Sequence, residues 1–426
     1  MSETLQVRDF LVVKKASIEV KQINVLIGRQ ANGKSLIAKL VYFFRRVSNH
    51  FFDGVRSQAT KRELDKSIVE DFESRFPRYA WEGSDFQVIY EIDEIQIVIA
   101  GEIMASGKTK VTVAYSENLN KLFNSKKRTY AKRLEEYRAE ESPRRRSMNY
   151  QSHAMYECVV EPLKQSEHGR FFSSSVFVPA SRSFFANLQK NIFTFMASNL
   201  DIDPFLKEFG SLYESSKRWY RDAYFPRKPE DIADALDRSI ETIIDGRYEY
   251  DDEQDWIQSK GRRVNLVNAS SGQQEALPML LTLAVWPFVR GEDVGSMFFI
   301  EEPEAHLFPT SQSRIVSMLT ALCANLNVGF FVTTHSPYVL SALNNNILAG
   351  DVKNAGNITD DEFRKIGGDG YPINFEDVSA YTISGGTTKK ITDAEFRMIG
   401  AEVLDEVSDH FQSVMNNLLE RDGGEC

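Results

Sequence analysis

The chain has 426 residues, of which 42% are hydrophobic and 26% are charged, and its formal net charge is −10. This composition is typical of a soluble globular protein with a large core and one or two appended lobes. The negative charge disfavours indiscriminate binding to nucleic acid but is compatible with a local basic groove. No apolar run reaches the ~18 residues of a membrane-spanning helix, and Met1–Lys15 lacks the pattern of a secretory signal. Three scattered cysteines, Cys158, Cys323 and Cys426, argue against a disulfide framework or a zinc site. We therefore expect a cytoplasmic protein without a membrane partner.

The first 150 residues are predicted to form strands, one glycine-rich turn and two helical stretches. Alternation of Val, Ile and Tyr indicates an antiparallel sheet in the middle of this part. The predicted elements are two short strands in Leu5–Val20, a buried strand at Ile23–Ile27, a helix from Ser35, strands in Phe86–Ile103 and Lys108–Tyr115, and a charged helix with an exposed turn in Asn124–Arg146.

The later part of the chain has the compact texture of an α/β core from Val264 onward. We read Ala276–Val289, which Pro278 and Pro287 interrupt, as a buried core helix. The other predicted elements are a strand at Ser174–Val178, helices at Asp203–Tyr220 and Pro229–Ile244, a helix after Gly272, a strand at Met297–Glu301, a helix at Ser311–Ala324, a strand at Val328–Thr333 and a tail helix at Asp393–Glu420.

A phosphate-binding loop is the clearest motif. The segment fits G-x-x-x-x-G-K-[ST], follows a predicted strand and opens a predicted helix, which is the context that a P-loop requires. Its backbone N–H groups and the helix N-terminus favour phosphate. Lys34, which we expect to be exposed in a concave site, supplies a charge for the β- and γ-phosphates, and Ser35 is expected to ligate Mg²⁺. The nucleotide-binding residues are Gly28, Arg29, Gln30, Ala31, Asn32, Gly33, Lys34 and Ser35.

Two adjacent acids end the apolar strand Met297–Glu301. Glu301 stands where a water-mediated Mg²⁺ ligand belongs, and Glu302 stands where a general base could accept a proton from the attacking water. Surface acids often cap strands, so the pair alone is ambiguous. Because it follows a P-loop, we favour a catalytic role for Glu302, with Glu304 and His306 as the next candidates.

Two further segments have weaker signals. Asn268–Glu275 places Ser271 and Gly272 at the start of an apolar helix, where they could bind an anion or where a serine could simply cap the helix. Phe330–Pro337 ends a buried strand at His335, which could hydrogen-bond the γ-phosphate, although most lone histidines have no such role.

The order of these four motifs resembles the ABC-type ATPase family, which includes the SMC-like DNA-repair ATPases. The similarity is closer to the ATPase module of the overcoming-lysogenization-defect (OLD) family and its stand-alone relatives. Those proteins carry segments similar to Ile300–Pro309 and Thr333–Pro337, and Val178–Ser183 looks like a further family element. The resemblance covers roughly Leu5–His50 and Val176–Leu343.

The resemblance implies an α/β P-loop NTPase of the ABC/SMC-head type, with an antiparallel β lobe and an inserted helical lobe. Residues 1–50 and 172–426 would form the split core, residues 51–171 the accessory lobes, and residues 350–426 a tail of the core. It also implies a homodimer, or a higher homo-oligomer, that sandwiches ATP and Mg²⁺. Lys34, Ser35, Glu301, Glu302 and His335 would act on the nucleotide of their own protomer, and Ser271, Gly272 and Gln273 on that of the partner. Gln273 replaces a usual glycine, and Glu301 replaces a usual aspartate.

Several classes of ABC-type ATPase were weighed. The long separation of Lys34 and Ser271 is unlike a transporter cassette, and sustained heptads of an SMC coiled coil are absent from that part of the sequence. No convincing acid cluster of a Toprim nuclease follows His335, and for Asp201 and Asp203 we expect no catalytic role.

The resemblance therefore favours a stand-alone OLD-like ATPase of two-component anti-phage systems such as the PARIS and Septu types. In these systems a separately encoded effector, such as a nuclease, acts after a DNA or phage-protein trigger. The alternatives are an SMC-like repair or recombination ATPase that engages DNA directly, and a nucleotide-driven scaffold. Lys126–Arg146, with nine basic and four acidic residues, is either a solvated surface or an arm that contacts phosphates or a partner.

Overall fold

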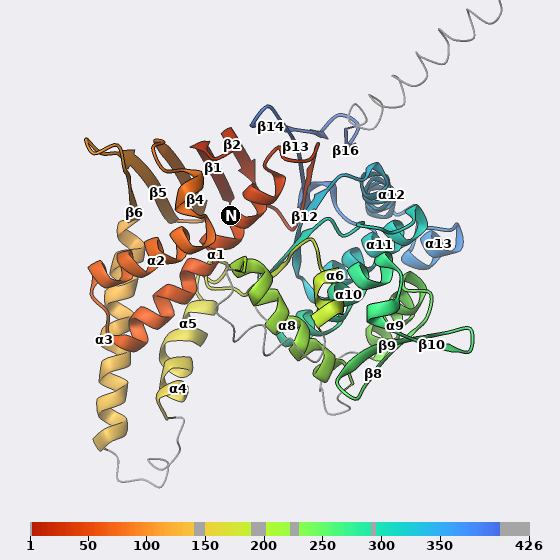
Figure 1. Cartoon of the computed structure of the whole chain (residues 1–426), viewed down its shortest axis with the longest axis horizontal. Helices are drawn as coiled ribbons and strands as arrows, with labels where there is room; N and C mark the ends of the chain where they lie inside the picture. The colour runs from red at the N-terminus through yellow and green to blue at the C-terminus, as the bar shows by residue number, and fades with distance from the viewer. Residues whose placement is uncertain (1, 140–149, 189–201, 222–229, 291–294, 401–426) are drawn as a thin grey trace, which may run out of the picture.

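The computed structural model describes residues 2–139, 150–188, 202–221, 230–290 and 295–400 (Figure 1). One large sheet passes through the molecule, with the strand order β6-β5-β4-β1-β2-β14-β13-β3-β12-β11-β7. Its strands are β1 (Glu3–Phe10), β2 (Val13–Glu19), β3 (Ile23–Ile27), β4 (Phe86–Ile92), β5 (Ile95–Ile103), β6 (Thr109–Tyr115), β7 (Ser175–Val178), β11 (Met297–Glu301), β12 (Gly329–Thr334), β13 (Val378–Ser384) and β14 (Thr387–Lys390).

Five strands, β7, β11, β12, β3 and β13, form the parallel core of the sheet. Every residue of β3, β11 and β12 is buried, as expected for parallel strands covered on both faces. Successive side chains point to opposite faces. Phe299 packs on Tyr42 of helix α1 (Lys34–Ser57), whereas Phe298 and Ile300 belong to the core cluster on the other face. The predicted buried strands are therefore confirmed.

Helices cover the two faces of this core. Helix α1 lies on one face, whereas the buried residues of α10, α11 and α12 belong to the cluster on the other. The helices are α1 (Lys34–Ser57), α2 (Lys61–Arg75), α3 (Glu117–Ala139), α4 (Tyr150–Met155), α5 (Glu161–Lys164), α6 (Ser183–Leu188), α8 (Pro204–Arg221), α9 (Glu230–Ile243), α10 (Ser271–Arg290), α11 (Pro309–Leu326), α12 (Pro337–Asn354) and α13 (Asp360–Lys365). Helix α10 confirms the predicted core helix and contains both prolines.

The antiparallel lobe continues the same sheet beyond β14. Its five strands pair antiparallel with their neighbours in the order β2-β1-β4-β5-β6. Aromatic side chains fill the space beneath it: Phe10 packs on Phe72, Phe76 and Phe86 with ring centroids 4.7–5.6 Å apart. Figure 1 shows α2 and α3 beneath this lobe, and α3 beside α4. The predicted antiparallel lobe is confirmed.

A second, three-stranded antiparallel sheet precedes α10 and has no counterpart among the predicted elements. It consists of β8 (Arg247–Asp251), β9 (Gln254–Ser259) and β10 (Arg262–Asn265). Asp255 of β9 is fully buried and accepts hydrogen bonds from Tyr213 and Tyr248, both at 2.8 Å. Lys217 of α8 completes this network at 3.0 Å from Asp255, so the small sheet is joined to α8 by buried polar contacts.

The predicted tail helix is wrong at its start. Residues from Thr392 to Ile399 form a small hairpin, β15 (Thr392–Asp393) and β16 (Met398–Ile399), and the remainder of the predicted helix lies outside the described residues. Asp393 accepts hydrogen bonds from the N–H groups of Glu395 and Phe396, which favours a turn over a continuing helix. Among the helices that the structure describes, none has both the length and the apolar composition needed to cross a membrane.

Candidate nucleotide site

The P-loop joins β3 to α1, as the sequence predicts. Gly33 has φ 99° and sits next to the antiparallel lobe, where an added Cβ would lie 2.8 Å from Cγ2 of Val13. A side chain is therefore excluded both by the backbone conformation and by space. Behind the loop, Asn32 donates to the carbonyl of Ile383 at 3.3 Å. Strand β13, which the sequence did not reveal, thus supports the loop from behind.

Lys34 is folded back onto its own loop. Its ammonium group donates to the carbonyls of Gly28 at 2.6 Å and Arg29 at 2.9 Å. Only 5% of the residue is exposed, so the expectation of an exposed Lys34 is wrong. Burial lowers the pKa of Lys34, and the negative charges of Glu302 and Glu304 oppose that shift. Because a buried ammonium needs acceptors, it takes the loop carbonyls.

Strand register brings the other predicted residues to the same edge. Ile27 of β3 pairs with Thr334 of β12, and Thr333 pairs with Glu301 of β11. The residues that follow these strands therefore leave the sheet together, since the strands are parallel. The catalytic candidates Glu302 and His335 are among them.

Three functional groups meet at this edge. Nε2 of His335 lies 3.2 Å from Oε1 of Glu302 and 3.1 Å from the Lys34 amine. Glu304 fixes the histidine by accepting its backbone N–H at 2.7 Å and the hydroxyl of Thr334 at 2.7 Å. The predicted P-loop, paired acids and histidine are thus brought together in one chain, and Glu304 is a supporting residue.

Glu301 has the features expected of a residue facing a metal or its waters. The residue is 5% exposed, and its Oε2 accepts the N–H of Ala180 at 3.1 Å. None of the described residues donates a hydrogen bond to its buried Oε1, and such a carboxylate oxygen normally accepts one. A hard cation that prefers oxygen ligands suits this carboxylate. Mg²⁺ would be held by Glu301 and by Ser35, which lies on the first turn of α1. The ion would neutralise part of the negative charge of the phosphates.

No cluster of three or more His, Cys, Asp or Glu side chains within the described ranges is placed to hold a metal ion. This finding is compatible with magnesium in nucleotide sites, because that ion is held mainly by phosphates, waters and one or two protein oxygens.

The contacts at the start of α10 show which side chains of the Ser-Gly segment could contact a nucleotide. Ser270 accepts the N–H of Gln273, and Gln273 accepts the N–H of Ser270, so the two cap the helix reciprocally. Gln273 also donates to the carbonyl of Ile244 at 2.7 Å. Its side chain is therefore engaged in fixing the helix end. Ser271 is exposed.

Gly272 brings this helix end close to the acids. A Cβ there would lie 2.7 Å from the backbone oxygen of His306. A glycine at this position is thus explained by close packing against the segment that follows Glu302, apart from any phosphate contact.

Arg182 and Glu275 are the residues that sequence reasoning missed. Val178–Ser183 was noted only as a family element, with no role for its arginine. In the structure Arg182 is fully buried and hydrogen-bonds the backbone carbonyls of Glu275, Glu301 and Glu302. An arginine in the turn that follows the buried strand β7 was the available signal.

Other candidates lie away from this edge. In α3, Lys132 and Arg133 pair with Glu136, and Arg133 also pairs with Glu157. Asp203 caps α8 and pairs with Lys39. Arg144, Arg145, Arg146 and Asp201 lie outside the described residues. The basic arm therefore stays a prediction.

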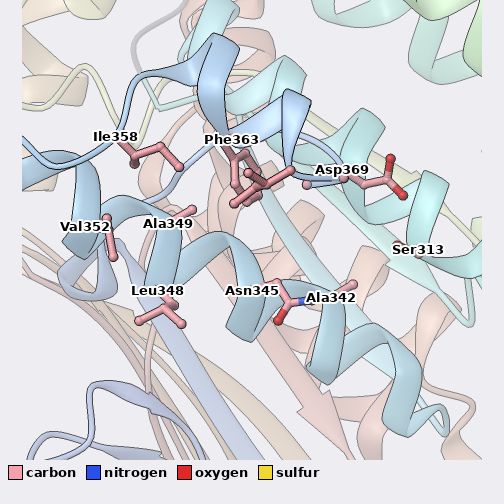
Figure 2. A pocket seen from close by; sticks show the side chains of 12 residues that line it. Ser313, Ala342, Asn345, Leu348, Ala349, Val352, Ile358, Phe363 and Asp369 are labelled. Atoms are coloured by element: carbon pink, nitrogen blue, oxygen red, sulfur yellow. The ribbon is translucent and has the colours of Figure 1, made fainter.

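A hollow of about 400 Å³ lies between α12 and α13 (Figure 2). Apolar side chains, including Leu348 and Phe363, form much of its wall. None of the P-loop residues lines it, so it is separate from the nucleotide site.

Residues 173–340 match the AAA ATPase domain family. The chain is an ATP-hydrolysing enzyme. The matched segment contains Arg182, the start of α10, the paired acids and His335, and the structure adds the P-loop on the neighbouring strand. The predicted α/β fold with a P-loop and an antiparallel β lobe is confirmed, and its assignment to the ABC/SMC-head type stays a prediction. The OLD-like branch stays a prediction.

Three solved structures illustrate the similarity. The SMC head bound to the C-terminal winged-helix domain of ScpA is 12% identical, with a TM-score of 0.40, and the alignment covers 92% of this chain and 96% of that one. The SMC head of Thermotoga maritima is 11% identical, with a TM-score of 0.35, and the alignment covers 92% of this chain and 98% of that one. The recombination mediator RecF–ATPrS is 12% identical, with a TM-score of 0.31, and the alignment covers 92% of this chain and 98% of that one. No curated protein sequence matches the chain.

Replacing Lys34 with alanine should abolish ATP binding. The change removes the only ammonium group that contacts the P-loop carbonyls of Gly28 and Arg29 among the described residues, and with it the charge that would meet the phosphates. Binding is measured by isothermal titration calorimetry, and folding by circular dichroism.

The matched control is Lys39→Ala, one turn further along α1, where the lysine pairs with Asp203. This variant should bind ATP like the unmodified protein. Undiminished ATP binding by folded Lys34→Ala would refute the P-loop assignment.

Proposed function

We propose that two copies of this ATPase enclose ATP between them, and that the nucleotide state controls a separately encoded effector in anti-phage defence. The observation that supports it most is the arrangement of one protomer. Lys34, His335 and Glu302 converge at one strand edge, whereas Ser271 is exposed at the start of α10. A protomer thus presents a P-loop half-site and, separately, a free helix start that suits an anion.

The P-loop half-site has a group for each step of hydrolysis. When ATP enters, Lys34 exchanges the carbonyls of Gly28 and Arg29 for phosphate oxygens. Glu302, with 35% of its side chain exposed, accepts the proton of the attacking water. His335 lies between the two and orients them by its contacts with both. Glu304 is a weaker candidate for the base because Oε1 is committed to Thr334 and His335.

The helix start would complete the site of the second protomer. Ser271 is exposed. Although Ser270 accepts the N–H of Gln273, the other N–H groups at the start of a helix have no intrahelical acceptor. An anion at this end is favoured by the helix dipole. The γ-phosphate bound by the partner's P-loop is such an anion, and this is the arrangement that the family resemblance implies.

A mixture of Lys34→Ala and Ser271→Arg proteins should regain ATPase activity that each lacks alone. In the mixed dimer, the intact P-loop of one protomer faces the intact helix start of the other, so one of the two sites is whole. Activity well above the sum of the two separate variants is expected in a phosphate-release assay. A mixture that forms heterodimers, shown with differently tagged chains, yet stays inactive would contradict the shared site.

Glu302→Gln should bind ATP but hydrolyse it ~10²–10⁴-fold more slowly, the usual effect of losing a general base. Because hydrolysis no longer empties the site, the ATP-bound dimer should accumulate and elute at twice the monomer mass in light scattering. The double variant Lys34→Ala/Glu302→Gln is the control and should stay monomeric. Wild-type turnover by Glu302→Gln would assign the base elsewhere, with Glu304 the next candidate.

The switch role follows from how binding energy is shared. If the γ-phosphate contacts two protomers, its presence and its loss favour different dimer arrangements, and a partner that prefers one arrangement becomes coupled to hydrolysis. Helices α3 and α4 lie side by side away from the parallel core in Figure 1 and offer a surface for such a partner. In this proposal the trigger is DNA or a phage protein.

The product of the neighbouring gene should therefore co-purify with this chain in a nucleotide-dependent manner. Glu302→Gln with ATP and Lys34→Ala present the two extreme states, so the amount of effector captured should differ between them. Equal capture by both would contradict a nucleotide switch. Salt-sensitive DNA binding that is lost when Arg144, Arg145 and Arg146 are neutralised would instead favour the DNA-engaging alternative.

A further inference from the structure

Arg182 is fully buried beside the nucleotide site and serves as a junction between three elements. Its guanidinium donates to the carbonyl of Pro179 after β7, at 2.9 Å, and to that of Glu275 on α10, also at 2.9 Å. It further donates to the carbonyls of Glu301 at 2.7 Å and Glu302 at 3.0 Å, at the end of β11. One side chain thus holds the backbone of both catalytic-site acids and the first part of α10.

Glu275 returns these contacts from α10. Its carboxylate accepts the backbone N–H of Arg182 at 2.9 Å and that of Ser183 at 3.1 Å. It also accepts the hydroxyl of Ser183 at 2.6 Å. Glu275 follows Ser271 by one helical turn, so the two residues lie on the same side of α10. A displacement of Ser271 along or across the helix axis therefore moves Glu275 as well.

The Glu302 peptide depends on its neighbours. Glu302 has φ 44°, a left-handed conformation that is unfavourable for a residue with a side chain. Its N–H donates to the carbonyl of Thr333 at 2.8 Å, and its own carbonyl accepts from Arg182. These two hydrogen bonds hold the backbone that aims the Glu302 carboxylate at His335.

Burying an arginine in a core costs free energy, because its charge is removed from water. Burial lowers the pKa of Arg182, while Glu275 and the acids Glu301, Glu302 and Glu304 raise it. An apolar side chain of similar volume often stabilises a protein as well as a buried ion pair does. Only the planar fork of arginine reaches several carbonyls in fixed directions. The side chain is therefore suited to holding elements in one relative position.

We infer that Arg182 is a positioning residue that links the α10 helix start to Glu302 within one protomer, and so couples the two ATP sites of the dimer. This inference rests on the proposed function, because Ser271 must contact the nucleotide of the partner. Engagement of Ser271 there shifts α10, Glu275 carries the shift to Arg182, and Arg182 adjusts the backbone of Glu301 and Glu302. Each site then hydrolyses ATP faster when the other also holds ATP.

The test is Arg182→Lys, which keeps the charge but replaces the fork by one ammonium group. ATP affinity, measured with the Glu302→Gln background, should stay within about twofold because the P-loop is untouched. The kcat should fall about 10–100-fold, as expected for small misplacement of a catalytic group. The Hill coefficient for ATP should drop from above 1 to about 1, the value for independent sites.

Two further variants separate positioning from folding. Ser183→Ala removes one hydroxyl contact to Glu275 and leaves Arg182 in place. It should change kcat and the Hill coefficient in the same direction but less. Arg75→Lys is the matched control, since Arg75 is another buried arginine, bound to Asp71 and Glu208 in a different region. It should lower the thermal midpoint but leave the Hill coefficient unchanged.

The outcomes distinguish this inference from the proposed function. If Glu302→Gln alone forms no ATP-dependent dimer, the shared site itself is refuted. If that dimer forms, and folded Arg182→Lys or Ser183→Ala keeps the wild-type kcat and Hill coefficient, the shared site stands and the role of Arg182 is refuted. A Hill coefficient of about 1 in the unmodified protein, with dimerisation intact, would also refute the coupling.

Discussion

The side-by-side parallel pairing of β3, β12 and β11 is the constraint on which the nucleotide site depends. Ile27 pairs with Thr334, and Thr333 pairs with Glu301. Because the three strands run in the same direction, the segments that follow them all begin at one edge of the sheet. The P-loop, His335 and Glu302 meet there without any long excursion of the chain. The ammonium of Lys34 is satisfied by loop carbonyls and lies against His335. ATP therefore has to compete with contacts that the protein makes to itself, and the competing group is the one that then binds its phosphates.

The parts of this site with local sequence signals could be predicted. A glycine-rich turn between a strand and a helix, and apolar strands that end in Glu301 or His335, are recognised within a window of ten or so residues. β13 gave no such signal, because its place beside β3 is set by a pairing across most of the chain length. The burial of Lys34 was also hidden, since it depends on where its amine finds acceptors in three dimensions. The order of the strands in the large sheet, and the existence of β13 and of the β8–β10 sheet, were the unpredictable parts.

Gly272 shows how a correct motif can have a second physical cause. The sequence suggested that the glycine admits a phosphate, and the structure shows that it admits the backbone oxygen of His306. The two explanations do not exclude each other. The close packing means that α10 and the segment after the paired acids move together, whether or not a nucleotide is present. Gln273 contributes by capping that end with Ser270, which leaves Ser271 as the exposed member of the group.

Departures from ordinary core chemistry concentrate at this edge. The strands are filled by apolar side chains, yet Arg182 is buried among carbonyls and Glu302 has a left-handed backbone. In addition, the buried Oε1 of Glu301 has no partner in the part of the chain that the structure describes. Each feature costs stability by itself. Arg182 touches the peptides of both acids, so it offsets part of the cost of the other two. Local rules of packing are broken together at functional sites more often than elsewhere. An apolar core at this position would give comparable stability but would not hold Glu302 toward His335. We therefore interpret the residues that the Arg182 guanidinium joins as one functional unit.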